Sequence, residues 1–401
     1  MEQLFSKLNE LYGEIVEIRR HLHENPELSF EEVETPKYIA AYHQALGHEV
    51  RTEVGGRGVV AVLKGGRPGK TVALRADFDA LPIQEENEVP YKSKVPGVMH
   101  ACGHDGHTAS LLGLAKALNS IKDELQGNVV FIHQHAEEVT PGGAIAMIED
   151  GCLEGVDVIY GTHLMSTMPV GDIVYGVGPF MAAADSFEIT VQGKGGHGAM
   201  PHLSKDAVVI ASQLVVNLQQ VVSRKTNPLS PAVVSVGSFE AKNAFNVIAD
   251  KAVLHGTVRT FNEDVRDMIE GEIDNVAKGT CLISGASYSY TYSKGYPALV
   301  NHKEDTDFVV EIAKGVPGVE KIVEGEPQMG GEDFSYYLQH VKGTFFFTGA
   351  EIPNRETTYP HHHPKFDIDE RALLIAAKTL GKAAVTYLAN NSLKENGVTV
   401  G

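Results

Sequence analysis

The chain has 401 residues, and its 34 basic residues face 52 acidic ones, which gives a formal net charge of −18. Nucleic acid and an anionic membrane surface are therefore poor partners, because both would be repelled. The length exceeds the size at which a single hydrophobic core usually keeps growing, so we expect two domains.

The cysteines are Cys102, Cys152 and Cys281, an odd and widely spaced set that does not suggest a disulfide framework. The segment from Met1 to Arg20 carries charges every few positions, where a signal peptide would need an apolar core. No stretch is long and apolar enough to suggest a membrane span. We therefore expect a cytoplasmic protein in a reducing compartment.

The first part of the chain alternates between helical and strand patterns. Apolar residues recur at steps of three and four from Leu4 to Leu22, which is typical of an amphipathic helix. Residues 128–132 and 156–160 are continuous apolar runs, as in buried parallel strands. Strand, helix and strand recur in the order that predicts an α/β fold with a mainly parallel sheet flanked by helices.

The pattern changes near Ala182. Strands are predicted over residues 185–192, 232–239, 252–260 and 287–293, and helices over residues 206–222 and 263–282. This order predicts a compact α+β unit with one sheet. From Pro297 the longer segments return and end in a helix over residues 370–388. We therefore expect a larger domain of residues 1–181 and 297–401, interrupted by an inserted domain of residues 182–296.

The segment from Met99 to Thr108 has the sequence MHACGHDGHT, in which one cysteine, three histidines and one aspartate surround two glycines. Thiolate and imidazole bind zinc-like metals, and glycine allows the tight turn that brings neighbouring side chains onto one ion. Glu137–Glu138, His163 and His361–His363 follow apparent strand or loop ends and could complete the site. Together these segments predict a metallohydrolase.

The two neighbouring glutamates suit two different tasks. One of Glu137 and Glu138 can bind a metal while the other takes a proton from a water molecule. The triplet His361–His363 is internal, so it is not an expression tag. Three consecutive rings cannot all face one ion in an extended chain, so at least one of them is exposed or supports another ligand.

Two glycine patterns resemble nucleotide-binding motifs but lack their context. Gly193–Gly198 matches G-x-G-x-x-G, yet Pro201 follows and no βαβ unit surrounds it. Gly69–Thr71 ends like a P-loop but lacks the first glycine and leads into a strand. We interpret His197 instead as a side chain on a flexible loop that closes over the active site. Neither G-x-S-x-G nor H-E-x-x-H occurs.

Several segments together resemble the dinuclear metallo-amidohydrolases, in the branch of hippurate hydrolase, bacterial N-acyl-amino-acid deacylases and plant auxin-conjugate hydrolases. These segments are Cys102–Asp105, Glu137–Glu138, Gly195–His202, Asn246–Ile248 and His362-x-Pro364-x-Phe366. The match spans nearly the whole chain. The resemblance implies a metal-binding catalytic α/β domain and an inserted lid domain that mediates a homodimer or higher homo-oligomer. It also implies two divalent metal ions, with zinc, manganese, cobalt and nickel all plausible.

The resemblance further assigns roles to individual residues. The implied metal ligands are Cys102, His104, Glu138, His163 and His362. The implied catalytic residues are Glu137 as general base, His197 as oxyanion donor, and Asp77. The implied substrate contacts are Asn246, Arg259 and Gly331. Arg75 stands where peptidase relatives carry a histidine ligand, and Cys102 stands in for a bridging carboxylate.

The activity implied by the resemblance is hydrolysis of the amide bond of an N-acyl amino acid to a carboxylic acid and a free amino acid. Glu137 would take a proton from a water molecule shared by the two metals and return it to the departing amine. A dipeptidase or an N-acetyl-diaminopimelate deacetylase would keep the same metals and change only the pocket. A non-catalytic, metal-stabilised binding protein is the remaining alternative, although it would not need a general base.

Overall fold

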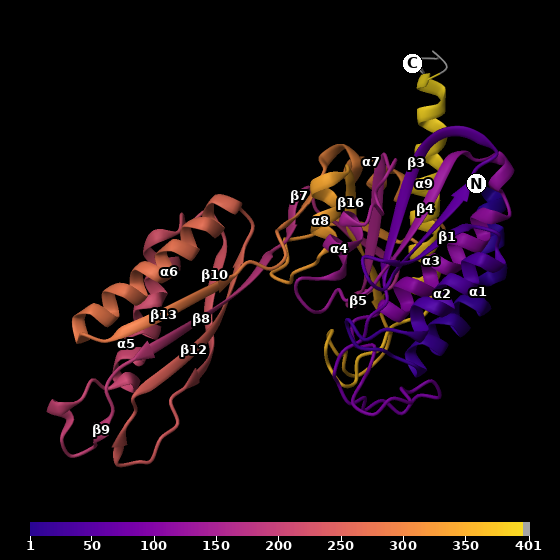
Figure 1. The fold of residues 1–401 in the computed structure, drawn as a ribbon. Helices are drawn as coiled ribbons and strands as arrows, with labels where there is room; N and C mark the ends of the chain where they lie inside the picture. Colours follow the sequence, from indigo (N-terminus) through magenta and orange to yellow (C-terminus); the bar gives the residue numbers. More distant parts are fainter. Residues whose placement is uncertain (396–401) are drawn as a thin grey trace. The chain divides into compact units, whose positions relative to one another are not determined.

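The computed structural model describes residues 1–395 and forms two compact units (Figure 1). The first unit comprises residues 1–180, residues 300–326 and the chain from Asp333 onward, and the second comprises residues 181–299 and 327–332. We expected residues 327–332 in the larger domain. They belong to the second unit because the Ala182 N–H lies within hydrogen-bond distance of the carbonyls of Gln328 and Gly330, at 3.0 Å from each.

The first unit is built on one eight-stranded sheet with the order β1-β2-β4-β3-β5-β16-β6-β15. Its strands are β1 (Glu49–Val54), β2 (Gly58–Lys64), β3 (Arg67–Asp77), β4 (Gln126–Gln134), β5 (Val158–Pro169), β6 (Asp172–Tyr175), β15 (Lys321–Glu324) and β16 (Gly343–Glu351). The central strands β4, β3, β5 and β16 run parallel, whereas β1 and β2 pair antiparallel at one edge. A mainly parallel sheet within an α/β fold is thus confirmed.

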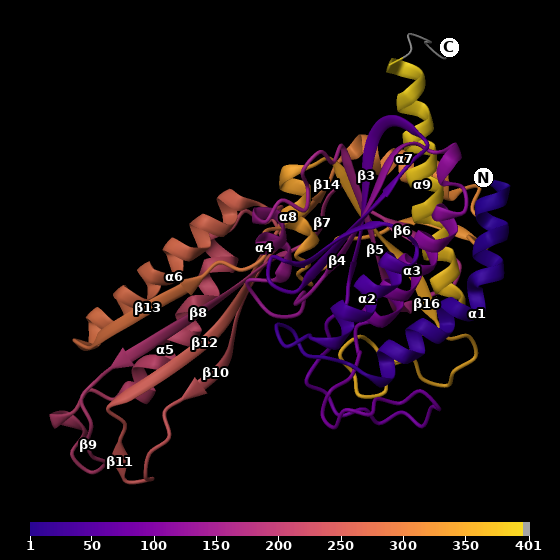
Figure 2. The same ribbon diagram turned by 45° about the vertical axis from the view of Figure 1, so that its right-hand side comes forward.

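Helices cover both faces of this sheet, with α3 and α9 on one face and α4 and α8 on the other (Figures 1 and 2). The helices of the first unit are α1 (Glu2–Glu24), α2 (Glu34–Ala45), α3 (His104–Asn119), α4 (Gly143–Glu149), α7 (Lys303–Ala313), α8 (Phe334–His340), α9 (Arg371–Glu395) and the short 3₁₀ helix η1 (Lys122–Glu124). The apolar stripe of α1 is buried against α3 and α9, as its spacing predicts. Residues of β3 alternate, so Leu74 joins this core while Arg75 points to the face of Phe334.

Helix α9 is the one described helix that is long and apolar enough to cross a membrane by length and composition, so the expectation that no stretch passes this test was wrong. Its window Arg371–Asn391 has a mean hydropathy of 1.3, and 67% of it is buried inside the protein. Core helices of folded domains have the same composition.

The second unit has a four-stranded antiparallel sheet with the order β10-β12-β8-β13, and two helices pack on one of its faces. The strands are β8 (Ala183–Gln192), β10 (Ala232–Glu240), β12 (Lys251–Thr260) and β13 (Ser287–Ser293), and the helices are α5 (Ala207–Gln220) and α6 (Glu263–Ser284). The side chains of Asp206 and Asn262 cap the two helices by accepting backbone N–H bonds.

Smaller elements of the chain complete the description. Strands β9 (Gly196–His197) and β11 (Val247–Ile248) form a ribbon in the second unit, and β7 (Gly178–Met181) pairs with β14 (Leu299–Asn301). The second unit also contains the 3₁₀ helix η2 (Pro201–Leu203) and the π-helix η3 (Val221–Lys225), which continues α5.

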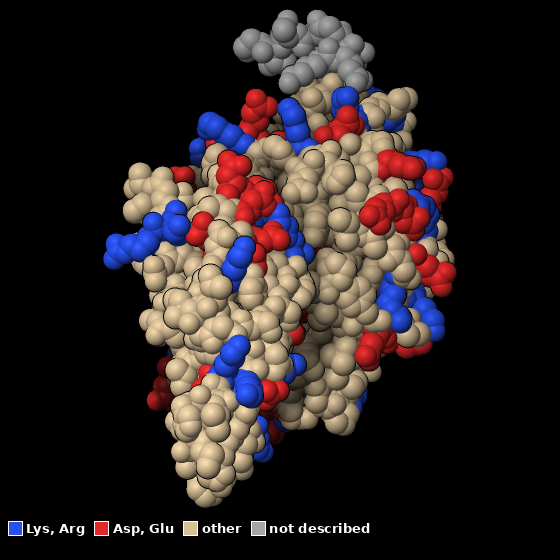
Figure 3. Space-filling model, turned by 60° about the vertical axis from the view of Figure 1, so that its left-hand side comes forward, with Lys and Arg blue, Asp and Glu red and all other residues tan. Residues whose placement is uncertain are grey.

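Acidic and basic side chains are interspersed on the face drawn in Figure 3. Exposed lysines commonly sit beside a carboxylate of the same helix, as in the pairs Lys7–Glu10, Lys37–Glu34 and Lys303–Asp307. The net charge of −18 therefore reflects acidic residues in excess of these local pairs.

Three buried histidines form a hydrogen-bonded row between α2, β1 and β4. His43 Nδ1 lies 2.9 Å from His48 Nδ1, and His43 Nε2 lies 2.9 Å from His133 Nε2. Burial lowers the pKa of His43 to about 2, of His48 to about 4 and of His133 to about 3. All three imidazoles are therefore neutral in the folded protein at neutral pH.

We expect this row to make the fold acid-sensitive. The folded-state pKa values lie below the unfolded value of about 6.5, so the unfolded chain binds protons first and stability falls as pH drops below that value. Each histidine should reduce the free energy of unfolding by about 1–2 kcal/mol between pH 7 and pH 5. Urea unfolding at several pH values between these limits measures the slope.

Substitution of the central histidine separates this row from the other titrating groups. His43→Gln should make the free energy of unfolding less dependent on pH. His255→Gln, at an exposed position of the second unit, should leave that dependence as in the wild type. Equal slopes in all three proteins would contradict the role of the row.

Candidate metal centre

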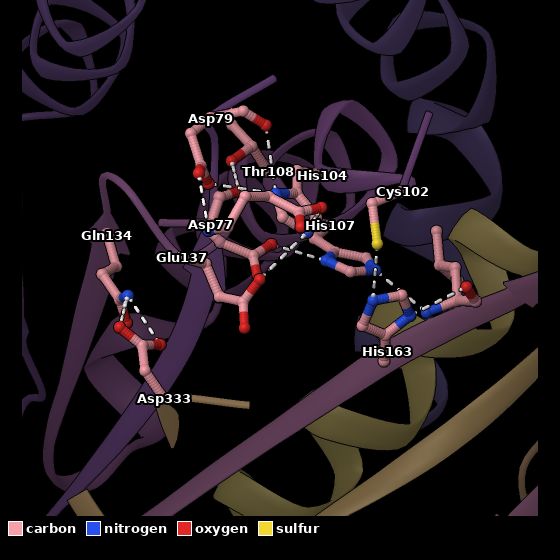
Figure 4. A network of polar contacts seen from close by, with 12 residues as sticks. Asp77, Asp79, Cys102, His104, His107, Thr108, Gln134, Glu137, His163 and Asp333 are labelled. Carbon is pink, nitrogen blue, oxygen red and sulfur yellow. Dashed lines mark hydrogen bonds and ion pairs between the residues drawn. The ribbon is translucent and has the colours of Figure 1, made fainter. Parts of the chain in front are cut away.

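The Cys102–His104 segment turns sharply at Gly103, which has a φ of +89° and caps α3. Glycine adopts this left-handed conformation without strain, and the turn lets His104 begin the helix directly after Cys102. Asp77, Asp79 and Glu137, from the ends of β3 and β4, face this segment (Figure 4). The carboxyl ends of the parallel strands β3 and β4 and the start of α3 therefore converge here, as is usual for sites in α/β sheets.

His104 has the hydrogen bonding of a metal ligand. Its Nδ1 lies 3.0 Å from the backbone carbonyl of Asp79 and 3.1 Å from its Oδ1, so Nδ1 carries the proton. Its Nε2 is buried without a hydrogen-bond partner and lies 4.0 Å from Glu137 and 3.9 Å from Glu138. A buried lone pair aimed between carboxylates fits a divalent cation, and a carboxylate or carbonyl on the other nitrogen is the usual support.

The charges around His104 agree with this geometry. Burial by itself would lower the pKa of His104, but the carboxylates of Asp77 and Asp79 outweigh it and raise the pKa to about 10. The surroundings of this ring thus favour positive charge, whether it comes from a proton or from a bound cation.

His163 of β5 extends the site toward Cys102, which precedes α3. His163 Nδ1 donates to the carbonyl of Leu164 at 2.9 Å, which turns Nε2 toward Cys102 Sγ at 3.4 Å. The donor atoms of Cys102, His104 and His163 all lie within 4.8 Å of one another. Burial, with the charges of nearby carboxylates, raises the pKa of the Cys102 thiol well above its usual value. A bound metal would reverse this, because it takes the thiol as thiolate.

A second group of donors shares Cys102. His362 has a φ of +64°, and its N–H donates to the carbonyl of Ala101 at 2.8 Å, which fixes its loop beside Cys102. His362 Nε2 lies 3.3 Å from Glu138 Oε1. The donor atoms of Cys102, Glu138 and His362 again lie within 4.8 Å of one another. The five residues named by the resemblance thus form two trios that meet at one sulfur.

Asp77 and His107 are hydrogen-bonded to each other beside the proposed ligands and support them. His107 Nδ1 donates to Asp77 Oδ1 at 2.6 Å, and His107 Nε2 accepts the Leu164 N–H at 2.9 Å, so both nitrogens are engaged. Asp77 Oδ2 accepts from Arg75 at 2.6 Å and lies 3.7 Å from His104 Nε2. These contacts are those of positioning residues, and the catalytic role expected for Asp77 stays a prediction.

Two carboxylates without a predicted role hold the Glu137–Glu138 loop. Asp79 Oδ2 accepts the N–H of Glu138 at 3.0 Å, and Glu32 Oε1 accepts the N–H of Ala136 at 2.9 Å. The spacing of Asp77 and Asp79, two residues apart in the sequence, is the signal that could have identified Asp79. Glu32 gave none, because its partner lies more than a hundred residues away in the chain.

The structure places His197 and Asn246 together in the second unit. His197 lies in β9 and Asn246 directly precedes β11, and the Gly198 N–H donates to the Asn246 carbonyl at 2.8 Å. His197 Nδ1 accepts the N–H of Ala199 at 3.1 Å, so the neutral ring carries its proton on Nε2. This exposed tautomer is the one that can donate a hydrogen bond to a developing oxyanion.

Arg259 and Gly331 lie at the other end of the same sheet. Arg259 pairs with Ala184 across β12 and β8, and a Cβ built on Gly331 would come within 2.9 Å of the Ala184 side chain. A strand rises about 3.3 Å per residue, so the eight steps from Ala184 to Gln192 span about 26 Å. His197 follows Gln192, so the two pairs of expected substrate contacts occupy opposite ends of the second unit.

Residues 73–386 match the model of peptidase family M20/M25/M40. The chain belongs to this family. It is 61% identical over 386 residues to the Bacillus subtilis (strain 168) protein YhaA, named as an amidohydrolase, with 96% of this chain and 98% of the relative covered. An N-acyl-L-amino acid amidohydrolase of Geobacillus stearothermophilus is 46% identical, with 76% and 82% covered.

A solved structure supports the same family assignment. A Bacillus subtilis protein described as a dinuclear metal binding peptidase from the M20 family superimposes with a TM-score of 0.82 at 37% identity, covering 95% of this chain and 99% of that one. The resemblance inferred from the motifs is thus confirmed, and this M20-family chain is a hydrolase of amide bonds. The alternative of a non-catalytic, metal-stabilised binding protein is therefore rejected.

One buried arginine joins two ligand-bearing segments of this M20-family chain. Arg19 of α1 is fully buried and donates to Asp105 at 2.9 Å, to Asp367 at 3.1 Å and to Glu370 at 3.2 Å. Asp105 directly follows His104, and Asp367 follows the loop of His362. The guanidinium therefore holds the start of α3 against the chain that leads into α9.

We expect Arg19→Met to destabilise the protein by about 3–5 kcal/mol, because it removes the fully buried cation that Asp105, Asp367 and Glu370 share. Chemical unfolding of the purified variant measures this loss. Arg20→Met is the matched control on the same helix, since Arg20 pairs with Glu370 while its own side chain is 45% exposed. The control should lose no more than about 1 kcal/mol, and equal losses in the two variants would contradict the role of Arg19.

Proposed function

We propose that this protein hydrolyses the amide bond of N-acyl amino acids to a carboxylic acid and a free amino acid. The observation that carries the proposal is the pair of donor trios sharing Cys102, with Glu137 Oε2 only 4.0 Å from His104 Nε2. The named activity of the Geobacillus stearothermophilus relative supports the same substrate class.

Two divalent metal ions fit the donor set. Cys102, His104 and His163 would hold one ion, and Cys102, Glu138 and His362 would hold the other. Thiolate and imidazole suit zinc, manganese, cobalt or nickel. When bound, such ions polarise the substrate carbonyl and lower the pKa of water.

The remaining chemistry belongs to the chain's own side chains. Glu137 is buried beside the proposed ligand Glu138, in a loop held by Glu32 and Asp79. It would take the proton from the attacking water and deliver it to the leaving amine. His197 Nε2 would donate to the oxyanion, and the planar guanidinium of Arg259 suits the substrate carboxylate.

We expect metal-depleted protein to be inactive and metal-restored protein to release amine from N-acetyl- and N-benzoyl-amino acids. Glu137→Gln should keep its metals but lower turnover by about 10²–10⁴, the usual contribution of a general base. Amine release and metal content are measured side by side. Glu149→Gln, at an exposed position of α4, is the control and should behave as the wild type.

Two outcomes of this assay would change the assignment. Wild-type turnover in Glu137→Gln would remove the general base. A preference for dipeptides over acylated amino acids would move the protein to the dipeptidase alternative, which keeps the same metal ligands.

We also propose that the working form is a homodimer or higher homo-oligomer. The span of about 26 Å along β8 prevents one substrate from touching both His197 and Arg259 of the same second unit. A second copy can supply the missing pair. Exposed apolar side chains surround His197 and Asn246, namely Met200, Leu203, Phe245 and Val247. Such a patch is typical of a surface that another chain covers.

Mixed oligomers test this arrangement. His197→Asn and Glu137→Gln should each be nearly inactive alone. When the two are co-expressed with different tags and the hybrid is isolated, a site with Glu137 from one copy and His197 from the other should recover activity, up to about half of the wild type in a dimer. No recovery would mean that His197 acts within its own chain or not at all.

We further propose a reducing cytoplasmic location. Cys102, Cys152 and Cys281 are all unpaired and buried, and Cys102 is needed as a thiolate in the proposed centre.

A further inference from the structure

The chain between α1 and α2 reaches the two segments that follow β3 and β4. It turns over residues 28–32, where the Glu31 N–H donates to the Leu28 carbonyl at 2.9 Å, and we call this segment the α1–α2 turn. Phe30 within the turn has a φ of +64°. A residue other than glycine adopts this left-handed conformation at a cost that its surroundings must offset. With this shape, the side chains of Ser29 and Glu32 reach the chain just after β3 and β4.

Ser29 contacts the segment that follows β3. Its hydroxyl donates to Asp79 Oδ2 at 2.7 Å. The same oxygen accepts the N–H of Glu138 at 3.0 Å, and the other carboxylate oxygen lies 3.1 Å from His104 Nδ1. Asp79 is buried, so these donors rather than water set the orientation of its carboxylate. Ser29 therefore restrains a carboxylate that two proposed metal ligands share.

Glu32 contacts the segment that follows β4. Its side chain is fully buried, and Oε1 accepts the N–H of Ala136 at 2.9 Å. Ala136 has a φ of +51°, so the backbone is held in a strained conformation directly before Glu137. Ala136 is itself fully buried, and bulk water has no access to this N–H. The carboxyl group of Glu32 therefore helps to hold the strained residue from which the Glu137–Glu138 loop starts.

Further contacts fix the α1–α2 turn between these segments. The ring of Phe30 lies edge-on to that of His135, with 5.9 Å between the ring centroids. Arg57 donates to the backbone carbonyl of Glu32. The partners of Ser29 and Glu32 lie 50 and 104 residues further along the chain. A short turn near the N-terminus thus joins the ends of two parallel strands through three of its side chains.

We propose that Glu32 and Ser29 are positioning residues for the Glu137–Glu138 loop. Glu32 acts through the N–H of Ala136, and Ser29 acts through Asp79. That the loop carries a general base rests on the proposed function, whereas the restraint on the loop does not. A shift of about 1 Å in a reacting group can cost about 10²-fold in rate. Loss of the restraint should therefore lower kcat and metal affinity and leave KM nearly unchanged.

The first test removes the acceptor on Glu32 and keeps a side chain of comparable size. Glu32→Leu should lower kcat for N-acetyl amino acids about 10–100-fold, and it should weaken binding of at least one zinc ion to the metal-depleted protein by a similar factor. Burial, together with the charge of Asp79, raises the pKa of Glu32 to about 8, so glutamine matches its uncharged form at neutral pH. Glu32→Gln keeps an oxygen for the Ala136 N–H and should retain most of the activity and zinc affinity. Glu31→Leu, at the exposed neighbouring position, is the matched control and should behave as the wild type.

The second test removes the hydroxyl that restrains Asp79. Ser29→Ala should lower kcat and zinc affinity less than Glu32→Leu does, because Asp79 keeps the donors from His104 and Glu138. Ser29 is only partly buried, so this variant also decides the role of the turn if Glu32→Leu does not fold. The urea midpoint of every variant is measured beside kcat, KM and zinc binding.

Wild-type kcat and zinc affinity in Glu32→Leu, or equal losses in Glu32→Leu and Glu32→Gln, would overturn the positioning role of Glu32. Wild-type values in Ser29→Ala would overturn that of Ser29. A change confined to the urea midpoint would overturn both and leave residues that only stabilise the fold. Zinc binding needs no turnover, so weakened zinc binding in Glu32→Leu, with no amine release by the wild type, would overturn the proposed function and support the positioning role.

Discussion

The hydrogen bonds that Asp79 accepts hold the candidate centre together. One comes from His104 Nδ1 and fixes the tautomer that leaves Nε2 for a metal, and another comes from the backbone N–H of Glu138. Asp79 is fully buried, and these donors lower its pKa although burial opposes that shift. A single carboxylate after β3 thus positions a proposed ligand of α3 and a proposed ligand after β4.

Two buried arginines also join separate segments of the chain, each through several side chains. Arg75 donates to Asp77, Gln134 and Asp333 at 2.6–2.9 Å, and Arg19 donates to Asp105, Asp367 and Glu370. Removing either guanidinium would take a buried cation away from several desolvated carboxylates, which is far more costly than breaking a surface pair. Arg75 thus holds Asp77 and the end of β4.

The second unit poses a different constraint, which is the length of its strands. A ten-residue β8 separates Arg259 and Gly331 from His197 and Asn246, and a hydrogen-bonded sheet cannot fold back to bring its ends together. The same strand that gives the unit a stable core therefore divides the expected substrate contacts into two groups. This division, rather than any single contact, is the reason to propose that a second copy takes part.

The sequence by itself determined the α/β class, most element spans and the residue types of the centre, because periodicity, turns and donor chemistry are local properties of the chain. The N-terminal apolar stripe became α1, and the cluster around Cys102 became the point where both trios meet. The resemblance named His104 among the histidines of that cluster, and only the tertiary structure gives the physical reason, which is a ring nitrogen left for a metal. His104 and His107 lie on one helix, yet Asp79 leaves His104 Nε2 open whereas Asp77 and Leu164 occupy both nitrogens of His107. It also assigned residues 327–332 to the second unit and brought Glu32 to Ala136, since these pairings join segments far apart in the chain and no local pattern encodes them.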